Sequence, residues 1–444
     1  MSQFFEETAR FKQSSKPQNE QSESRAHKQE NAAKNQRKRP LIVFTGGGTG
    51  GHVYPNVALV PEFEKRGFDV AYIGGEGNVI ERKIARDNGI KYYAIPTVKL
   101  VRGASLKALK NNLQIPSKLK KSVQKASEIL AKIRPDCVFS KGGFVSLPVV
   151  LAAKKANIPT FAHESDLTLG IANKIAKATG ATILKANPNS QFDGIFVGMP
   201  LRKNLVYKDK TAACKRLEIN NPFKKPILLV LGGSSGASAI NEAVKINLEK
   251  LTSKYFVLHV TGKNKGDKTC DCGDSTHEKR NKNSNPNCKT DDVRRQNCGD
   301  SSGCQYGENR NNKRSGSYLQ FEYADDIALF YTVCDVVLSR AGATSVFEIS
   351  SLGKKAVFVP LPKGTSRGDQ IFNADLAKDF GATIIKQDSS FCDNLPKAID
   401  KAMQNPPMKE ICADANGKIA DMVCDRLRRG EKCTDKKPSP NGSP

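Results

Sequence analysis

Short runs of apolar, mostly β-branched residues alternate along the chain with longer segments whose apolar positions recur every three to four residues. The runs predict buried strands, and the longer segments predict amphipathic helices. The strand candidates form two series, 41–44, 70–73, 137–139 and 160–162, then 227–231, 256–260, 335–338 and 356–360. Strands that alternate with helices pair as parallel sheets, so we expect an α/β protein with two parallel-sheet domains.

Three segments fall outside this pattern. Residues 1–40 and 431–444 have no periodic apolar face, which predicts disordered tails, the first of them mildly basic. Residues 264–316 are rich in Asn, Lys, Asp, Ser and Gly, which predicts a low-complexity insert without ordered structure. Proline and lysine residues near 198–225 indicate the connection between the domains. We place the first domain at 41–202 and the second at 203–410.

Composition narrows the range of partners. The 444-residue chain has 71 Lys and Arg against 45 Asp and Glu, a formal net charge of +26 at pH 7. Such a charge favours an anionic partner, either nucleic acid or an anionic membrane surface. The sequence lacks helix-turn-helix, RNP and zinc-finger spacings, so we expect no nucleic-acid partner. It also lacks an apolar stretch of the roughly 18 residues that a membrane span needs and a secretory signal at its start, so we expect neither insertion nor export.

The twelve cysteines do not indicate a disulfide framework. Cys137, Cys214, Cys334 and Cys392 stand singly in the body of the chain, as is typical of a reduced cytosolic protein. The cysteines of the 264–316 insert do not have the paired spacing of zinc sites. We therefore expect no metal site at these cysteines. We also expect the protein to use no metal and no cofactor.

The first predicted strand leads into a glycine-rich loop, residues 45–52 (TGGGTGGH), ahead of a helical segment. Glycines allow a ligand to approach the backbone closely, and a helix N-terminus attracts negative charge. The loop also satisfies the G-x-G-x-x-G pattern of dinucleotide folds. Those folds need an acidic residue at the end of the second strand to bind the ribose, but here the strand ends in Gly74 and Gly75, and Glu76 follows the strand end. NAD binding is therefore disfavoured. His52 closes the loop and is either a proton acceptor for a substrate hydroxyl or a helix-start histidine bonded to backbone.

A second small-residue loop, residues 232–237 (GGSSGA), follows the first strand of the second series. No Walker lysine follows it, so it predicts a diphosphate cradle at a helix start, or a tight turn without a ligand, and not a P-loop. Ligands of parallel sheets bind at the carboxyl ends of the strands. We therefore expect both loops to face one crevice between the domains.

These loops belong to a longer set of strings that resembles the MurG family, the undecaprenyl-diphospho-muramoylpentapeptide β-N-acetylglucosaminyltransferases. In family order, the strings are GGTGGHVYP at 47–55, KGGFVSLP at 141–148, HESD at 163–166 with NK at 173–174, GMPLR at 198–202, the second glycine loop, YADD at 323–326, SRAGAT at 339–344 with Glu348, and GDQ at 368–370 with NA at 373–374. The resemblance implies a GT-B fold, with two Rossmann-like parallel-sheet domains facing across a cleft and the first domain completed by a C-terminal helix near 411–430.

The resemblance also implies an activity. Members of this family transfer N-acetylglucosamine (GlcNAc) from UDP-GlcNAc to the C4 hydroxyl of N-acetylmuramic acid (MurNAc) in lipid I, with inversion, and form lipid II for peptidoglycan of the cell wall. We accordingly expect a peripheral enzyme at the cytoplasmic face of the plasma membrane that contributes to cell shape and cell division. Another GT-B glycosyltransferase acting on diacylglycerol, a UDP-GlcNAc 2-epimerase and an inactive basic binding protein are the alternatives.

Site residues follow from the same resemblance. Arg202, Arg340 and Ser234 are expected to contact the diphosphate of the donor. Glu348 is expected to bind the ribose hydroxyls, and the backbone of Ala324 is expected to contact uracil. Gln370 and Asn373 are expected at the sugar hydroxyls. The whole expected UDP-GlcNAc set is Thr49, Gly50, Gly51, Arg202, Ser234, Ala324, Arg340, Thr344, Glu348, Gln370 and Asn373, with Gly48, Gly142 and Gly143 in the acceptor and diphosphate loops.

Two catalytic candidates stay open. His52 is the candidate base, and Asp166, which stands where other members carry asparagine, is a second base candidate or orients the His52 imidazole. Asp369 stands where some relatives carry glutamine, so its contact with the sugar stays open as well.

Structural alternatives exist for several of these residues. Arg340 and Glu348 suit a surface ion pair on one helix, and His163 with Glu164 suits a buried structural pair. Between Lys99 and Lys125, basic residues are interleaved with leucines, which predicts an interfacial element on anionic lipid or a soluble amphipathic helix.

Overall fold

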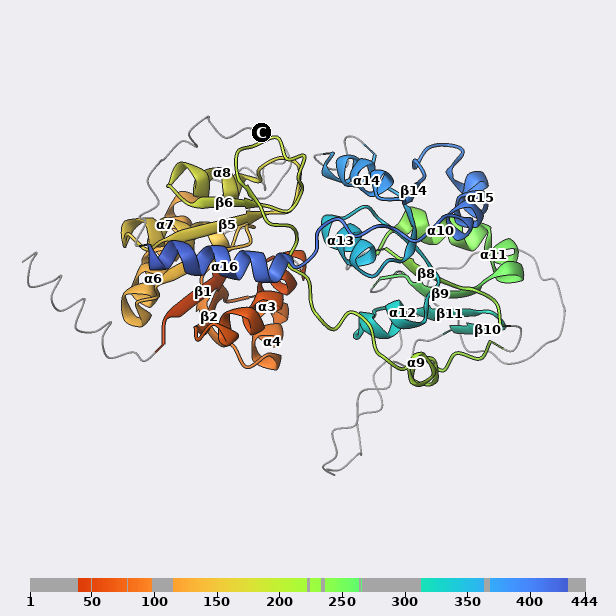
Figure 1. Ribbon diagram of the computed structural model, residues 1–444, viewed down its shortest axis with the longest axis horizontal. Helices are drawn as coiled ribbons and strands as arrows, with labels where there is room; N and C mark the ends of the chain where they lie inside the picture. The colour runs from red at the N-terminus through yellow and green to blue at the C-terminus, as the bar shows by residue number, and fades with distance from the viewer. Residues whose placement is uncertain are drawn as a thin grey trace, which may run out of the picture.

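The computed structural model describes residues 39–48, 50–77, 79–97, 115–221, 224–232, 236–262, 265, 313–362 and 368–429. Within these ranges the chain forms two seven-stranded sheets, side by side and each with helices on both faces (Figure 1). The strand order is β3-β2-β1-β4-β5-β6-β7 in the first sheet and β10-β11-β9-β8-β12-β13-β14 in the second. The expected α/β architecture of two parallel-sheet domains is confirmed.

The first domain is built from the following elements: β1 (Leu41–Thr45), α3 (Gly50–Lys65), β2 (Asp69–Gly75), α4 (Val79–Asp87), β3 (Lys91–Ile95), α6 (Ile115–Ile133), β4 (Cys137–Ser140), α7 (Ser146–Lys155), β5 (Thr160–Glu164), α8 (Ile171–Ala178), β6 (Thr182–Lys185) and β7 (Ile195–Phe196).

The second domain contains α9 (Lys210–Arg216), β8 (Ile227–Leu231), α10 (Ser238–Ile246), α11 (Leu248–Lys254), β9 (Phe256–Val260), β10 (Lys313–Ser315), β11 (Tyr318–Phe321), α12 (Ile327–Val333), β12 (Val336–Ser339), α13 (Ala343–Ser351), β13 (Lys355–Phe358), α14 (Asp369–Asp379), β14 (Thr383–Ile384) and α15 (Phe391–Gln404). The last helix, α16 (Ala415–Arg428), returns to the first domain.

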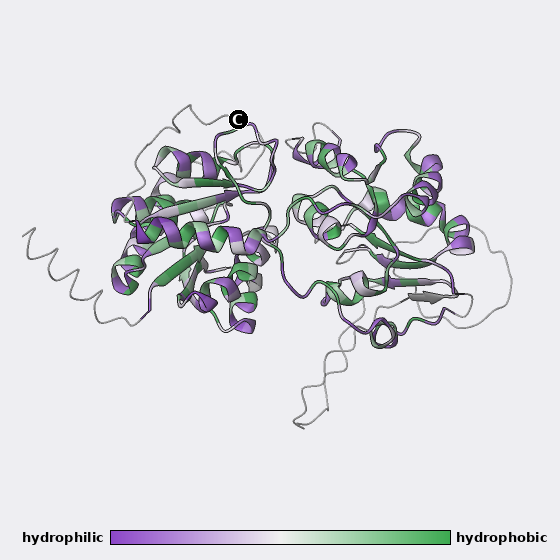
Figure 2. Ribbon diagram, viewed as in Figure 1, coloured by the Kyte–Doolittle hydropathy of each residue, from purple (hydrophilic) through white to green (hydrophobic). Residues whose placement is uncertain are grey.

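Each sheet separates two layers of core. In β1, Ile42 and Phe44 pack with α3 and α16, and Val43 packs on the opposite face with α6 and α7. Successive strand residues point to opposite faces, and a sheet covered on both faces therefore needs apolar residues at every position. This is why the strand candidates read as continuous apolar runs. Figure 2 shows the resulting pattern, with hydrophobic colour along the strands and hydrophilic colour on the outer faces of the helices.

The expected insert needs one correction. Its last residues, Lys313–Ser315, form β10 and pair antiparallel with β11, so the second sheet is mixed and the ordered chain resumes before residue 316. Most of the remainder of 264–316, with all its cysteines, lies outside the described residues, as do residues 1–38 and 430–444. Hydrogen bonding to the edge of β11 orders a segment whose composition alone argues against order.

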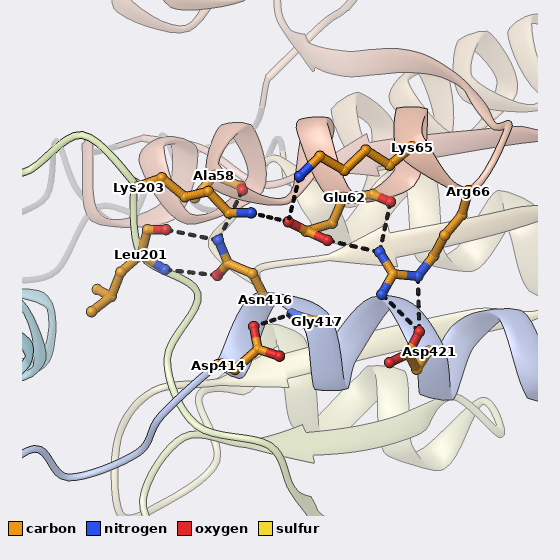
Figure 3. A network of polar contacts seen from close by, with 10 residues as sticks. All are labelled: Ala58, Glu62, Lys65, Arg66, Leu201, Lys203, Asp414, Asn416, Gly417 and Asp421. Carbon is orange, nitrogen blue, oxygen red and sulfur yellow. Dashed lines mark hydrogen bonds and ion pairs between the residues drawn. The ribbon is translucent and has the colours of Figure 1, made fainter.

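The chain crosses between the domains at two places in the described ranges, once after Gly198 and once after α15. The two crossings meet beside α3, where the side chain of Asn416 holds both (Figure 3). Its Nδ2 donates to the carbonyl oxygens of Leu201 (2.8 Å) and Ala58 (3.1 Å), and its Oδ1 accepts from the Leu201 amide (3.0 Å). This amide fixes the first crossing to the start of α16.

A buried carboxylate strengthens the same junction. Glu62 of α3 accepts from Lys203 of the first crossing and from Arg66 (2.8 Å), and Arg66 in turn pairs with Asp421 of α16 (2.7 Å; Figure 3). The hydrogen bonds from Lys203 and Arg66 lower the pKa of Glu62 to about 2. The junction therefore carries fixed charge at any physiological pH.

Candidate functional site

The two glycine loops of the first domain pack against each other. One follows β1 and the other follows β4, its neighbour in the sheet. Gly48 and Gly143 have φ values of +95° and +84°. A Cβ atom on Gly143 would lie 2.5 Å from the Gly47 carbonyl oxygen, and one on Gly48 would lie 2.5 Å from the Phe144 ring. Glycine is required here because the loops approach closely and because their backbone is left-handed.

Beneath the first loop lies the carboxylate of Glu81, from α4. It is 1% exposed and accepts hydrogen bonds from the amides of Gly48 (2.7 Å) and Gly75 (3.0 Å). The Gly48 amide therefore points into the domain and is not offered to a diphosphate in this conformation. Glu76, considered for a ribose contact, is exposed. Sequence reasoning missed Glu81; its signal is an acidic residue in the first turn of the helix that follows Gly74 and Gly75.

His52 lies in the first turn of α3. Its Nδ1 is 3.2 Å from the carbonyl oxygen of Lys141. A carbonyl oxygen only accepts, so Nδ1 carries the proton and Nε2 of the neutral ring is the proton acceptor. This is the tautomer that a base acting through Nε2 requires.

The Lys141 side chain is buried between the loops, with 3% exposure. Its ammonium donates to the Ser165 hydroxyl, and the carboxylates of Glu164 and Asp166 lie near enough to interact with its charge. Burial lowers the pKa of Lys141 to about 8, against the opposing effect of those carboxylates. Of the two catalytic candidates, His52 thus contacts the carbonyl oxygen of Lys141, and Asp166 lies near enough to its ammonium to interact with the charge. The sequence signal for it is a lysine at the end of a fully buried strand.

The pair His163 and Glu164 has the structural role considered as an alternative. Glu164 accepts from the amides of Ser165 (2.9 Å) and Gly170 (2.8 Å) and from Asn173 Nδ2 (3.0 Å). His163 Nε2 donates to the Gly198 carbonyl oxygen (2.8 Å), and burial holds its pKa well below the usual range. The two side chains shape the loop that presents Asp166.

In the second domain, three expected donor residues lie at the carboxyl ends of β12 and β13. Arg340 Nη1 donates to the Val359 carbonyl oxygen (3.2 Å), Gln370 Oε1 accepts from the Leu361 amide (3.1 Å), and Asn373 Nδ2 donates to the Ala341 carbonyl oxygen (3.2 Å). Asn373 is 2% exposed, so here it supports the loop and does not present a surface to a sugar. Burial lowers the pKa of Arg340.

Glu348 lies on α13 and is 7% exposed. Its Oε2 accepts from the Tyr331 hydroxyl (3.2 Å), and its Oε1 is 3.5 Å from Arg202 Nη2. The Arg202 guanidinium also lies over the ring of Tyr54 of α3, 4.6 Å from its centroid. The alternative of a surface ion pair between Arg340 and Glu348 is therefore wrong, because both side chains are buried and Glu348 pairs with Arg202.

The remaining expected residues divide into three groups. Gly50 and Gly51 begin α3, and Gly142 has a φ of +85° directly after Lys141. Ala324 and Thr344 are half-buried at the carboxyl-end side of the second sheet, after β11 and β12. Thr49, Ser234 and Gly233 lie outside the described residues.

Asp369 has a contact that the sequence did not suggest. Its Oδ1 accepts from the hydroxyl of Thr168 in the first domain (3.4 Å). The first turn of α14 therefore reaches the loop that follows β5, and Asp369 links the domains instead of lying only in the second.

Comparison with known proteins assigns each of the two domains to a protein family. Residues 42–184 match the glycosyltransferase family 28 N-terminal domain, and residues 227–284 and 294–423 match the glycosyltransferase family 28 C-terminal domain. The first range covers β1 to β6, and the second covers β8 to β14 and the first part of α16.

Two curated relatives carry the name UDP-N-acetylglucosamine–N-acetylmuramyl-(pentapeptide) pyrophosphoryl-undecaprenol N-acetylglucosamine transferase. The chain is 37% identical to that of Clostridium botulinum (strain Kyoto / Type A2) over 372 residues, 82% of this chain and 91% of the relative. It is 35% identical to that of Clostridium perfringens (strain 13 / Type A) over 375 residues, 83% of this chain and 91% of the relative.

Among solved structures, MurG of Acinetobacter baumannii is similar with a TM-score of 0.57 and 22% identity, over 88% of this chain and 99% of that chain. The glycotransferase of kitacinnamycin is similar with a TM-score of 0.55 and 13% identity, over 88% and 100% of the two chains. These likenesses confirm the expected GT-B arrangement of the fold.

Proposed function

The chain belongs to the MurG family, within glycosyltransferase family 28, and from this premise we propose that it transfers GlcNAc from UDP-GlcNAc to the C4 hydroxyl of MurNAc in lipid I. The product is lipid II, the precursor of peptidoglycan. The chain is a UDP-GlcNAc-dependent glycosyltransferase, and its relatives' name specifies both substrates.

One observation supports the assembly of a single site from both domains. Arg202 lies between Tyr54, on the helix that carries His52, and Glu348, the candidate ribose ligand of the second domain. Arg202 therefore connects the helix that begins at the first glycine loop with Glu348 of the second domain. A donor held by the second domain would face an acceptor held by the first.

The chemistry then follows from side chains already described. His52 Nε2 takes the proton of the acceptor C4 hydroxyl. At the same time the oxygen of that hydroxyl attacks the anomeric carbon of GlcNAc from the side opposite the nucleotide. The bond from the anomeric carbon to UDP breaks and the configuration inverts. Arg202 and Arg340 stabilise the charge that develops on the departing diphosphate, since guanidinium groups match phosphate geometry.

The acceptor is a lipid, so the proposed enzyme works as a peripheral protein at the cytoplasmic face of the plasma membrane. None of the helices in the described ranges is long and apolar enough to span a bilayer. On α6, Lys118, Lys120 and Lys121 are exposed, which suits contact with anionic lipid. The preceding part of the proposed interfacial segment, 99–114, lies outside the described residues. This role would connect the protein to cell shape and division.

A direct assay tests the proposal. Purified protein is incubated with UDP-GlcNAc and a lipid I analogue, and in parallel with UDP-GlcNAc and diacylglycerol. We expect the β-linked disaccharide product and UDP with lipid I only. Turnover on diacylglycerol alone would support the diacylglycerol glycosyltransferase, release of UDP with N-acetylmannosamine would support the epimerase, and no turnover would support a binding protein.

A further inference from the structure

Each carboxylate oxygen of Glu348 has its own partner. Oε2 accepts from the hydroxyl of Tyr331 on α12, which is 1% exposed, at 3.2 Å. Oε1 lies 3.5 Å from Nη2 of Arg202, whose side chain is about one third exposed (32%). One oxygen is therefore held inside the second domain, and the other lies on the side that solvent reaches.

Resting on the proposed function, in which Glu348 binds the ribose, we propose that Tyr331 is a positioning residue for the nucleotide sugar. Its hydroxyl fixes Oε2 in the interior and thereby turns Oε1 toward the ribose hydroxyls. Tyr331 itself does not touch the nucleotide, because the carboxylate stands between them.

The physical basis is preorganisation. A glutamate side chain that is free to rotate loses that freedom when it binds a ligand, and a fixed hydrogen bond removes the loss in advance. Burial raises the pKa of Tyr331 well above its usual range, so the phenol remains a donor at neutral pH. Tyr331 is held in turn by the core cluster that includes Phe330, Val333 and Phe347.

The same bond affects the charge of Glu348. Burial raises the pKa of Glu348, and the Arg202 charge and the Tyr331 hydrogen bond both oppose that rise. The charged and titratable groups that face Glu348 are Tyr331 from α12 and Arg202 from the domain connection, and Cys334 lies close to Tyr331. Loss of the Tyr331 hydroxyl should therefore raise the Glu348 pKa further.

The variant Tyr331→Phe tests the proposal because it removes one hydroxyl and keeps the ring. We expect the KM for UDP-GlcNAc to rise about three- to tenfold with kcat unchanged. Binding of UDP should weaken more than binding of 2′-deoxy-UDP, so the ratio of their inhibition constants should move toward one. The acid limb of 1/KM should shift to higher pH, since ribose binding is lost as pH falls through the Glu348 pKa.

A matched control distinguishes positioning from stability. Tyr255 of the same domain donates to Asp400 (2.8 Å) between α11 and α15, so Tyr255→Phe also removes a tyrosine-carboxylate bond. We expect it to change the melting temperature but neither the UDP to 2′-deoxy-UDP ratio nor the acid limb. In the background of Glu348→Gln, Tyr331→Phe should add nothing to the KM, because both act through one carboxylate.

Two results would overturn the proposal: an unchanged donor KM in Tyr331→Phe, or a loss of kcat and melting temperature with the inhibitor ratio unchanged. Failure of the wild-type protein to transfer GlcNAc would instead refute the proposed function. In that case the ratio of the dissociation constants of UDP and 2′-deoxy-UDP, measured by calorimetry, still tests the positioning role of Tyr331.

Discussion

The side chains around Lys141 separate the two candidate bases. His52 donates through Nδ1 to the Lys141 carbonyl and so presents Nε2 as an acceptor, whereas Asp166 lies near the Lys141 ammonium and interacts with its charge. We expect His52→Gln to lower kcat by about 10²- to 10³-fold and Asp166→Asn to lower it by less than about tenfold. Single-turnover rates with saturating donor measure both. The reverse order would make Asp166 the base.

Lys141 gives a prediction about stability. Its pKa is lowered from 10.5 to about 8, so the buried ammonium lowers the free energy of unfolding at neutral pH. Lys141→Met should therefore raise the free energy of unfolding at pH 7 by about 1–2 kcal/mol, after allowance for the lost Ser165 bond.

The pH dependence has a defined sign. Between pH 8 and 10.5 the unfolded chain binds more protons than the folded one, so wild-type stability rises with pH and the advantage of Lys141→Met shrinks across this window. Urea unfolding at several pH values measures this difference. A variant less stable than wild type at pH 7, with a difference that does not vary with pH, would contradict the assignment.

Residues within continuous motifs were predictable from the sequence, and their supporting partners were not. The first glycine loop, His52 and Glu348 stand in recognisable strings. Glu81 and Lys141 act on the first loop from positions 33 and 89 residues away from their partners, and Tyr331 acts on Glu348 across 17 residues. One sequence contains no information on which distant side chains pair, so only the fold identifies them.

At the scale of elements, all eight strand candidates are strands, with ends shifted by two residues at most. The strands that the pattern missed are the outer ones of each sheet, namely β3, β6 and β7 in the first and β10, β11 and β14 in the second. The two-residue β7 and β14 and the edge strand β10 are too short to give an apolar pattern, and their order depends on hydrogen bonds from a neighbouring strand. Element existence was therefore predictable in the core of each sheet and not at its edges.

The docking of α16 depends on one amide. Asn416→Ala removes three hydrogen bonds to Leu201 and Ala58, and we expect it to lower the free energy of unfolding by about 2–3 kcal/mol. Hydrogen exchange should speed up first in α16. Asn394→Ala, at an exposed position of α15, removes one bond to Ser390 and is the matched control, which should change stability little. Equal effects of the two variants would show that the junction contributes no special stability.

At the scale of the whole molecule, the charge on α6 should decide membrane binding. Reversal of Lys118, Lys120 and Lys121 to glutamate should weaken partition onto vesicles containing anionic lipid by more than about tenfold, since each basic residue contributes about 1 kcal/mol. The control reverses exposed lysines of the second domain, Lys250, Lys397 and Lys401. Similar loss in both variants would show that total charge, and not this helix, governs binding.

The return of α16 to the first domain has a consequence for synthesis of the chain on the ribosome. Ile419, Ala420 and Val423 lie in the same core as Phe44 and Phe63, which are made more than 350 residues earlier. Domains of a nascent chain usually fold in the order in which they emerge. Here the first domain must wait, with an apolar surface uncovered, until the second has been translated. A stop codon ahead of Ala415 would thus damage most the half of the protein that was made first.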